Sequence, residues 1–297
     1  MKIKLTLKDC GTGAGGFQPG NTCASGGGGG SSSTGSSSGG AGGGVGDDVV
    51  FRRADATSVH TPEATLDELS KDEDTLVRRS VGYNQITLPA TLAALSKDKE
   101  YNVRYAVATN PNTPEAILTE LSRDEAWNVR WAVAGNRSTP PAILAAISKD
   151  ESEFVRIDVA RNRNTPAATL FELARDGNVG VREYVALNRS SPPDALTAMS
   201  TDEIRRVRSA VAYNKNTPVA TLTAMSKDKE EVVRVEVARN KNTPPAILEE
   251  LSMDEEGEVR LGVARNPNTP EAALAELRHD FERDVSRAAW GEEDEDD

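Results

Sequence analysis

Few residues of this chain have the types and spacing that chemistry requires. Cysteine occurs only at Cys10 and Cys23, and histidine only at His60 and His279. Neither cysteine has a nearby histidine or a second cysteine pair, which a metal site of its own would need. With two histidines, the commonest general acid–base group is nearly missing. The sequence therefore favours a reversible disulfide or exposed thiols, and it predicts no catalytic residue, no metal site and no cofactor.

Glycines near the N-terminus match one nucleotide-binding motif. The run Gly11–Thr12–Gly13–Ala14–Gly15–Gly16 fits G-x-G-x-x-G and follows a strand-like segment, residues 1–10. The motif binds dinucleotides only where a helix follows within a βαβ unit, and Phe17–Gln18–Pro19–Gly20 starts no helix. Walker, H-E-x-x-H and G-x-S-x-G motifs are also missing. We therefore expect that the protein is not an enzyme.

Composition limits the partners. The 297 residues carry a net charge of −12, which disfavours nucleic acid because phosphate contacts need a basic surface. The sequence has no run of about eighteen apolar residues and no apolar segment typical of a secretory signal. We expect a cytoplasmic protein without membrane contact. The oligomeric state does not follow from these features.

The chain divides into four parts by composition. Residues 1–23 hold the strand-like segment and both cysteines, and we interpret them as a detachable tag or docking strand. Residues 24–46 contain 12 Gly and 7 Ser, the composition of a flexible linker. Residues 47–291 carry a net charge of −8 and are expected to fold. Residues 292–297 are all acidic, so a disordered, solvated tail is expected.

The folded part is a tandem repeat. Between about residues 59 and 290 the pattern recurs every 26 residues, and a fixed period of this length predicts a solenoid of stacked units. Valine recurs at this period from Val77 to Val285. Leucine recurs in each unit, at Leu66, Leu92, Leu118, Leu144, Leu170, Leu196, Leu222, Leu248 and Leu274.

Each unit predicts two short helices. The first begins at Thr-Pro, as at Thr113–Pro114, where the threonine is expected to accept hydrogen bonds from the free N–H groups of the helix start. The second begins near an aspartate such as Asp124 and is expected to end at an asparagine such as Asn136 in the left-handed conformation. Helices this short are stable only where neighbouring units cover them. Some turns are expected to be 3₁₀.

The terminal units deviate from the pattern, as the ends of a solenoid are expected to. Phe51–Arg52–Arg53 fits the Val–Arg position of a half repeat before the first full one. At the other end, Ser286 replaces the expected arginine and Trp290 replaces a small residue.

The pattern V-R-x-x-V-A-x-N-x-x-T-P-x-x-x-L-x-x-L-x-x-D resembles the leucine-rich repeat variant, a bacterial repeat, over roughly residues 59–290. The resemblance implies an all-α, right-handed superhelical solenoid of about nine repeats, with alternating α- and 3₁₀-helices and no sheet, similar to armadillo and HEAT repeats. Some family members carry an iron–sulfur cluster on an N-terminal cysteine-rich segment. Two cysteines do not supply the four thiolates that a cluster needs, so no cluster is expected here.

An arginine follows each repeated aspartate by six residues. One interpretation is a cationic track for phosphate or a carboxylate tail. The other is structural: each arginine bonds the aspartate of its own or the next repeat, a role that suits a partly buried guanidinium. We favour the structural interpretation because the pairs are identical in every unit. The pairs are Asp72 and Arg78, Asp98 and Arg104, Asp124 and Arg130, Asp150 and Arg156, Asp176 and Arg182, Asp202 and Arg208, Asp228 and Arg234, and Asp254 and Arg260.

Three positions of the second helix vary from unit to unit. They are residues 75, 79 and 83 and their equivalents 26 residues apart, and their i, i+4 spacing makes one stripe, expected on the concave face. Clustered Tyr and Trp are typical of protein interfaces, although packing against the N-terminal half repeat explains them equally well. The candidate partner-binding residues are Tyr83, Tyr101, Tyr105, Trp127 and Trp131.

The turns after the second helix are basic, whereas the opposite turns are acidic. An anionic partner along this basic edge is one interpretation, and a solvated edge that balances the acids is the one we favour. The edge comprises Arg137, Arg161, Arg163, Arg189, Lys215, Arg239, Lys241 and Arg265.

Together these features predict a scaffold or adaptor without catalysis that binds a protein partner through its variable face. Two alternatives come from other classes. One is nucleic-acid binding along the basic edge. The other is a regulatory protein with a redox or metal role for the N-terminal cysteine pair.

Overall fold

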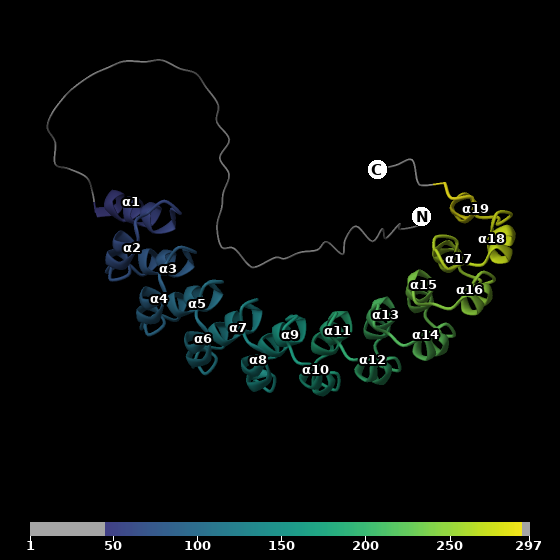
Figure 1. The fold of residues 1–297 in the computed structure, drawn as a ribbon, viewed down its shortest axis with the longest axis horizontal. Coiled ribbons are helices and arrows are strands. Elements are labelled where there is room, and N and C mark those ends of the chain that lie inside the picture. Colours follow the sequence, from purple (N-terminus) through teal and green to yellow (C-terminus); the bar gives the residue numbers. More distant parts are fainter. Residues whose placement is uncertain (1–44, 293–297) are drawn as a thin grey trace, which may run out of the picture. The chain divides into compact units, whose positions relative to one another are not determined.

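The computed structural model describes residues 45–292, with side chains from residue 48 onward. These residues form 19 α-helices and no strand (Figure 1). The predicted all-α repeat architecture is confirmed. Over residues 45–292, no helix is both long enough and apolar enough to cross a membrane.

Long and short helices alternate along the repeat region. The long helices are α1 (Val45–Thr57), α3 (Thr75–Tyr83), α5 (Tyr101–Thr109), α7 (Trp127–Gly135), α9 (Glu153–Arg161), α11 (Val179–Leu187), α13 (Arg205–Tyr213), α15 (Glu231–Arg239), α17 (Gly257–Ala264) and α19 (Arg283–Ala289). The short helices are α2 (Glu63–Leu69), α4 (Pro89–Leu95), α6 (Glu115–Leu121), α8 (Pro141–Ile147), α10 (Ala167–Leu173), α12 (Pro193–Met199), α14 (Val219–Met225), α16 (Pro245–Leu251) and α18 (Glu271–Leu277). The first long helix, α1, begins at Val45, just inside the range 24–46 predicted for the linker.

The repeats stack into an arc. The odd-numbered helices line its inner, concave side, and the even-numbered helices line its outer side (Figure 1). Each odd-numbered helix packs against the next one along the chain. Residues at one position of the repeat therefore form rows that run along the whole arc.

Two columns of apolar side chains fill the interior. The repeated valine is fully buried from Val77 to Val259, and the repeated leucine is buried from Leu66 to Leu248. Leu274 is only partly buried because the last repeat has no complete neighbour beyond it. Burying these side chains compensates for the weak intrinsic stability of helices of seven to nine residues.

The repeated threonine has a different role from the one predicted. Thr113 lies one residue before the helix cap, which is Pro114, and the pyrrolidine ring fixes the backbone there without any capping side chain. The buried Thr113 hydroxyl donates a hydrogen bond to the Val107 carbonyl at 2.6 Å. The Val107 carbonyl, near the end of α5, accepts this bond in addition to one from the Asn110 N–H.

The repeated asparagine also corrects a prediction. Asn136 has φ −70° and ψ 125°, an extended rather than left-handed conformation. Its side-chain amide donates to the carbonyls of Ala108 and Asn110 in the preceding repeat, at 2.7 and 3.0 Å. The asparagine therefore joins two repeats, and its side-chain oxygen, Oδ1, accepts the N–H of Ser138 in the following turn.

The short helix is α-helical with tighter ends. In α2, Leu66 and Ser70 make i→i−4 bonds, whereas Lys71 and Asp72 close the last turn with i→i−3 bonds of the 3₁₀ type. The 3₁₀ geometry that the family resemblance implies is therefore confined to helix ends in the described residues.

The first helix covers only part of the open end. Arg52 occupies the arginine position and bonds Asp72 at 2.6 Å, as a half repeat should. Phe51 lies at the valine position but is 69% exposed, because no earlier repeat stacks against it. At the other end, Trp290 lies 4.8 Å from the Arg278 guanidinium.

Candidate binding surface

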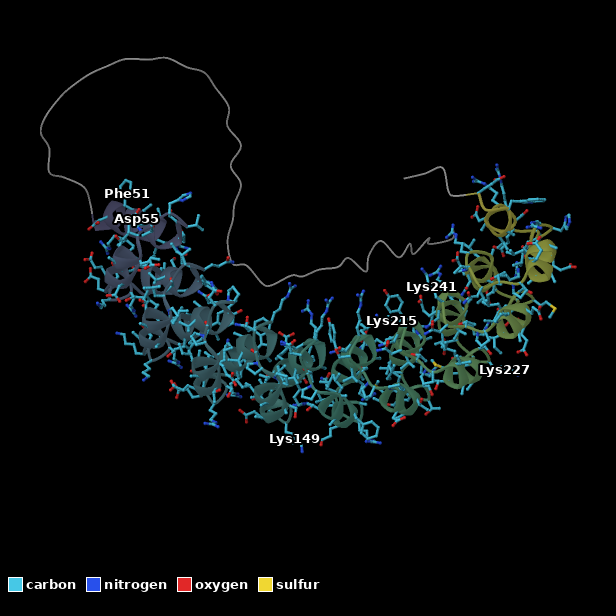
Figure 2. The ribbon with its side chains drawn as sticks, viewed as in Figure 1. Phe51, Asp55, Lys149, Lys215, Lys227 and Lys241 are labelled. Atoms are coloured by element: carbon cyan, nitrogen blue, oxygen red, sulfur yellow. The ribbon has the colours of Figure 1, made fainter. Side chains whose placement is uncertain are left out.

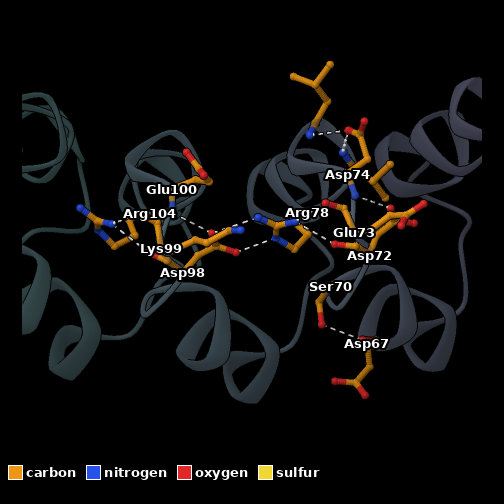
Figure 3. Close-up of polar contacts among 12 residues, drawn as sticks. Asp67, Ser70, Asp72, Glu73, Asp74, Arg78, Asp98, Lys99, Glu100 and Arg104 are labelled. Carbon is orange, nitrogen blue, oxygen red and sulfur yellow. Dashed lines mark hydrogen bonds and ion pairs between the residues drawn. The ribbon is translucent and has the colours of Figure 1, made fainter.

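The arginines of the repeated Asp–Arg pairs join neighbouring repeats. Arg78 donates from Nε to Asp98 Oδ2 of the next repeat at 2.7 Å and from Nη1 to the Asp72 carbonyl of its own repeat at 2.8 Å (Figure 3). The same two contacts recur at each repeat through Arg260. We call this row of nine ion pairs, from Arg52–Asp72 to Arg260–Asp280, the ladder. Its guanidinium groups are occupied within the fold.

Five of the ladder carboxylates are held in their charged form. Burial alone would raise the pKa of Asp98, but hydrogen bonds from Arg78 and from the Glu100 N–H outweigh burial and lower the pKa below its ordinary value. The same balance lowers the pKa of Asp202, Asp228, Asp254 and Asp280. The ladder is thus a structural device that depends on charge.

The aromatic side chains of the stripe form a connected cluster on the inner helices. Ring centroids lie 6.4 Å apart for Tyr83 and Tyr105, and 6.1 Å apart for Tyr105 and Trp131. Trp127 extends the cluster to Trp131 at 6.5 Å and to Phe154 at 5.3 Å. We call these five residues the aromatic cluster.

The two interpretations of these rings each describe part of the cluster. Tyr105 and Trp131 are partly buried and pack against the core, and burial raises the pKa of Tyr105. Trp127 is 42% exposed and Phe154 is 52% exposed. Tyr101 is also exposed, and it makes no ring contact with the cluster among the described residues. The cluster therefore has an anchored base and an open face.

Cations of the basic edge recur at one position in five successive repeats. Arg137, Arg163, Arg189, Lys215 and Lys241 each lie two residues after the end of a long helix, and all five are exposed. Figure 2 places Lys215 and Lys241 on the concave side, and Lys149 and Lys227 on the outer side. We call these five residues the cationic row. Within the described part of the chain, none of its side chains pairs with an acidic group.

The remaining basic-edge residues have partners. Arg161 lies 3.9 Å from Asp158 and 5.9 Å from the ring of Tyr184. Arg239 pairs with Glu236 at 3.7 Å and with Glu258 at 3.6 Å. Arg265 follows α17 and also has an interaction partner.

Two hollows lie side by side where the aromatic cluster meets the cationic row. The first, of about 310 Å³, is lined by Tyr105, Trp131 and Ala132 among others. The second, of about 670 Å³, is lined by polar groups that include Arg163, Arg189 and Tyr184. Both share a wall of Gly135, Arg137 and Asp158.

Asp158 is the unusual group in this wall. Its side chain is 13% exposed, and burial raises the carboxyl pKa to about 6, although Arg161 and a hydrogen bond with Trp131 act against burial. A Cβ placed on Gly135 would lie 2.9 Å from Asp158 Oδ2, so the glycine makes room for the carboxylate. This residue is protonated far more readily than an ordinary aspartate.

Sequence reasoning missed Asp158 and Phe154, and it placed Gly135 on the variable stripe without giving it a role. The stripe of positions 75, 79 and 83 omits position 80, where three repeats carry a large polar side chain in place of a small one. That contrast was the available signal. The position holds Ser80, Ala106, Ala132, Asp158, Tyr184, Ala210, Glu236, Gly262 and Ala288.

Comparisons with known proteins agree with this architecture. The family model for the leucine-rich repeat variant matches residues 101–126, 232–256 and 257–282. A solved structure of a leucine-rich repeat variant with a novel repetitive structural motif is 29% identical, with a TM-score of 0.55, and the match covers 80% of this chain and 89% of that chain. These matches support a helical repeat protein similar to the leucine-rich repeat variant.

Two further structures are more distant from this repeat protein. YibA of E. coli is 17% identical, with a TM-score of 0.46 over 82% of this chain and 95% of that chain. A computationally designed armadillo repeat protein for modular peptide recognition is 15% identical, with a TM-score of 0.24 over 77% of this chain and 97% of that chain. No curated protein matches the chain.

The matched repeat units follow the helices. The matched segments 101–126 and 257–282 each run from the start of a long helix, α5 or α17, to just before the next long helix. Cys10, Cys23 and the segment 1–23 lie outside the described residues, as does most of the predicted linker and tail. Among the described residues, no three His, Cys, Asp or Glu side chains are grouped to hold a metal ion.

Proposed function

We propose that this helical repeat protein is a scaffold that binds a protein partner on its concave side, without catalysis or a cofactor, in the cytoplasm. The observation that carries the proposal is the aromatic cluster: its base is packed into the solenoid and its open face is presented on the inner helices. Exposed, pre-positioned Trp, Tyr and Phe side chains are the usual anchors of protein interfaces. The interior beneath them is the same in every repeat, so the variation between repeats falls on this surface.

The experiment is a selection of random 12-residue peptides, displayed on phage, against the immobilised full chain. The test variant is Trp127→Ala/Phe154→Ala, which removes the open face and leaves the packed rings in place. The matched control is Phe281→Ala/Trp290→Ala, because these two side chains are 84% and 62% exposed and lie near the C-terminal end of the solenoid. All variants should keep the wild-type melting temperature, since the rings removed are exposed.

We expect the selected peptides to bind wild type and control alike, and the test variant at least about tenfold more weakly, as for an interface anchor. A selection without enriched peptides, or equal binding by all three proteins, contradicts the proposal.

A further inference from the structure

The two hollows differ in chemistry but share a wall. Tyr105 and Trp131 give the first hollow an aromatic side, whereas Arg163 and Arg189 give the second a cationic one. Arg137 and Asp158 lie between them. One ligand that occupies both hollows must therefore present an apolar group next to an anionic group.

The charge of the second hollow is positive. Four arginines line it, Arg137, Arg161, Arg163 and Arg189, against the single carboxylate of Asp158. Arg161 lies next to that carboxylate, which leaves three guanidinium groups of the cationic row without an acidic partner in the described part of the chain. Arginine presents a planar fork of donors that suits a carboxylate.

The ladder shows that this arrangement is not a general property of the repeat. Every ladder arginine is 6–25% exposed and is bonded to the next repeat. The arginines of the cationic row are exposed and line a hollow instead. In the described part of the chain, their side chains form no hydrogen bond or ion pair that joins two repeats.

The second hollow is also built by specific residues. Gly135 occupies a position where the neighbouring repeats carry Thr109 and Arg161, and Asp158 occupies a position of small residues. Tyr184, at the same position as Asp158 one repeat later, faces Arg161. These three departures from the repeat pattern coincide at one place on the arc.

We infer that the two hollows together bind an extended peptide segment in which an aromatic or aliphatic side chain lies close to an acidic side chain. The apolar side chain would pack against Trp131 and Tyr105, and the carboxylate would receive hydrogen bonds from Arg163 and Arg189. The inference rests on the proposed function, because it specifies the chemistry of the protein partner.

A peptide fits these charges better than a nucleic acid. Duplex DNA carries about one negative charge per 1.7 Å of its axis and needs a continuous cationic surface. Here the cations are one repeat apart, about 10 Å for packed helices, and the carboxylate of Asp158 lines the same hollow. A short acidic segment beside an apolar anchor places one charge where the arginines are.

The test uses the peptides selected above. The charge variant is Arg163→Gln/Arg189→Gln, which keeps much of each side-chain stem. The matched control is Lys215→Gln/Lys241→Gln, which removes two charges at the same position of later repeats, outside the hollow. A second set of the selected peptides carries Gln or Asn in place of each Glu or Asp.

We expect the selected peptides to be enriched in acidic residues near an aromatic or aliphatic residue. The charge variant should bind them about tenfold more weakly than the control does, and the amide peptides should lose the same factor on the wild type. Binding to the wild type should weaken as salt is added, because exposed charges are screened.

The two proposals fail in distinguishable ways. Peptides that depend on Trp127 and Phe154 but not on acidic residues keep the proposed function and overturn this inference. Equal losses in the charge variant and the lysine control overturn it as well, since the effect would then come from overall charge. Binding of a 20-nucleotide single-stranded DNA that the charge variant loses, without acidic peptides in the selection, replaces the peptide with a nucleic acid. A selection without enriched peptides contradicts both proposals.

Discussion

The two ends of the long helices use the same residue types for opposite purposes. At the N-terminal ends, each ladder arginine bonds an aspartate of the next repeat and carbonyls of its own. At the C-terminal ends, the arginines of the cationic row extend from the turns and pair with no acid in the described residues. Arginine and aspartate content alone therefore says little about function. What separates structure from recognition is whether the partner of each charge lies within the fold.

The aspartates differ in the same way. Hydrogen bonds from an arginine and a backbone N–H lower the pKa of Asp202 in the ladder, whereas burial raises the pKa of Asp158 to about 6 on the concave side. The ladder therefore stabilises the charged form of Asp202, whereas burial on the concave side disfavours the charged form of Asp158.

Acid should have the largest effect on stability, because it protonates ladder aspartates whose charged form the fold stabilises. A carboxylate whose pKa is lower in the folded state contributes stability above its unfolded pKa, and that stability is lost as pH falls through the folded pKa. The ordinary pKa of an aspartate such as Asp202 or Asp228 is 3.8. We therefore expect the stability of the fold to fall steeply below about pH 4, with loss of the helical circular dichroism signal. Circular dichroism melts from pH 6 to pH 2 measure this. A melting temperature that stays constant below pH 4 would contradict a charge-dependent ladder.

A single arginine from each side gives the next largest contrast. Arg182→Ala leaves Asp202, whose side chain is 8% exposed, without its partner, and removing one member of such a buried pair costs about 3 to 5 kcal/mol. Arg189→Ala, seven residues later, removes an exposed side chain and should change the free energy of unfolding by less than about 0.5 kcal/mol. Urea unfolding of both variants measures the difference. Similar losses for the two would show that the cationic row also holds the repeats together.

The period of the sequence was enough to predict the solenoid, because identical apolar positions in every unit leave stacked helices as the way to bury them. It was not enough to assign hydrogen bonds. A threonine hydroxyl can accept or donate, and Thr113 donates because a carbonyl of the preceding helix lies within reach. Asn136 was assigned to a left-handed turn on its type alone, whereas its amide reaches back to residues 26 and 28 positions earlier.

The candidate surface was predictable in part for a similar reason. Variation between repeats indicated Trp127 and Trp131, since positions that face the interior cannot vary so freely. Phe154 and Asp158 lie one position away from the predicted stripe. Asp158 fits because Gly135 of the preceding repeat makes room for it, and Phe154 contacts Trp127. This packing is not encoded in the i, i+4 spacing.

Asp158→Asn should have a smaller effect on stability, and it should stabilise the protein rather than destabilise it. Because burial raises the pKa of Asp158 to about 6, the charged form costs stability above pH 6, and this cost disappears as pH falls towards the ordinary value of 3.8. Asparagine removes the charge and keeps an oxygen that can accept from Trp131. We expect the variant to be more stable than wild type by about 2 kcal/mol at pH 8 and to match it near pH 4.

The measurement is urea unfolding of both proteins at pH 8, 6 and 4.5. Glu183→Gln serves as a control, because Glu183 lies on α11, the next odd-numbered helix after the one that carries Asp158, and pairs with Arg206 at 3.1 Å. This substitution should not be stabilising at any of these pH values. If Asp158→Asn is no more stable than the wild type at pH 8, the carboxylate is not opposed by its surroundings. The contrast between the two sides would then reduce to the arginines alone.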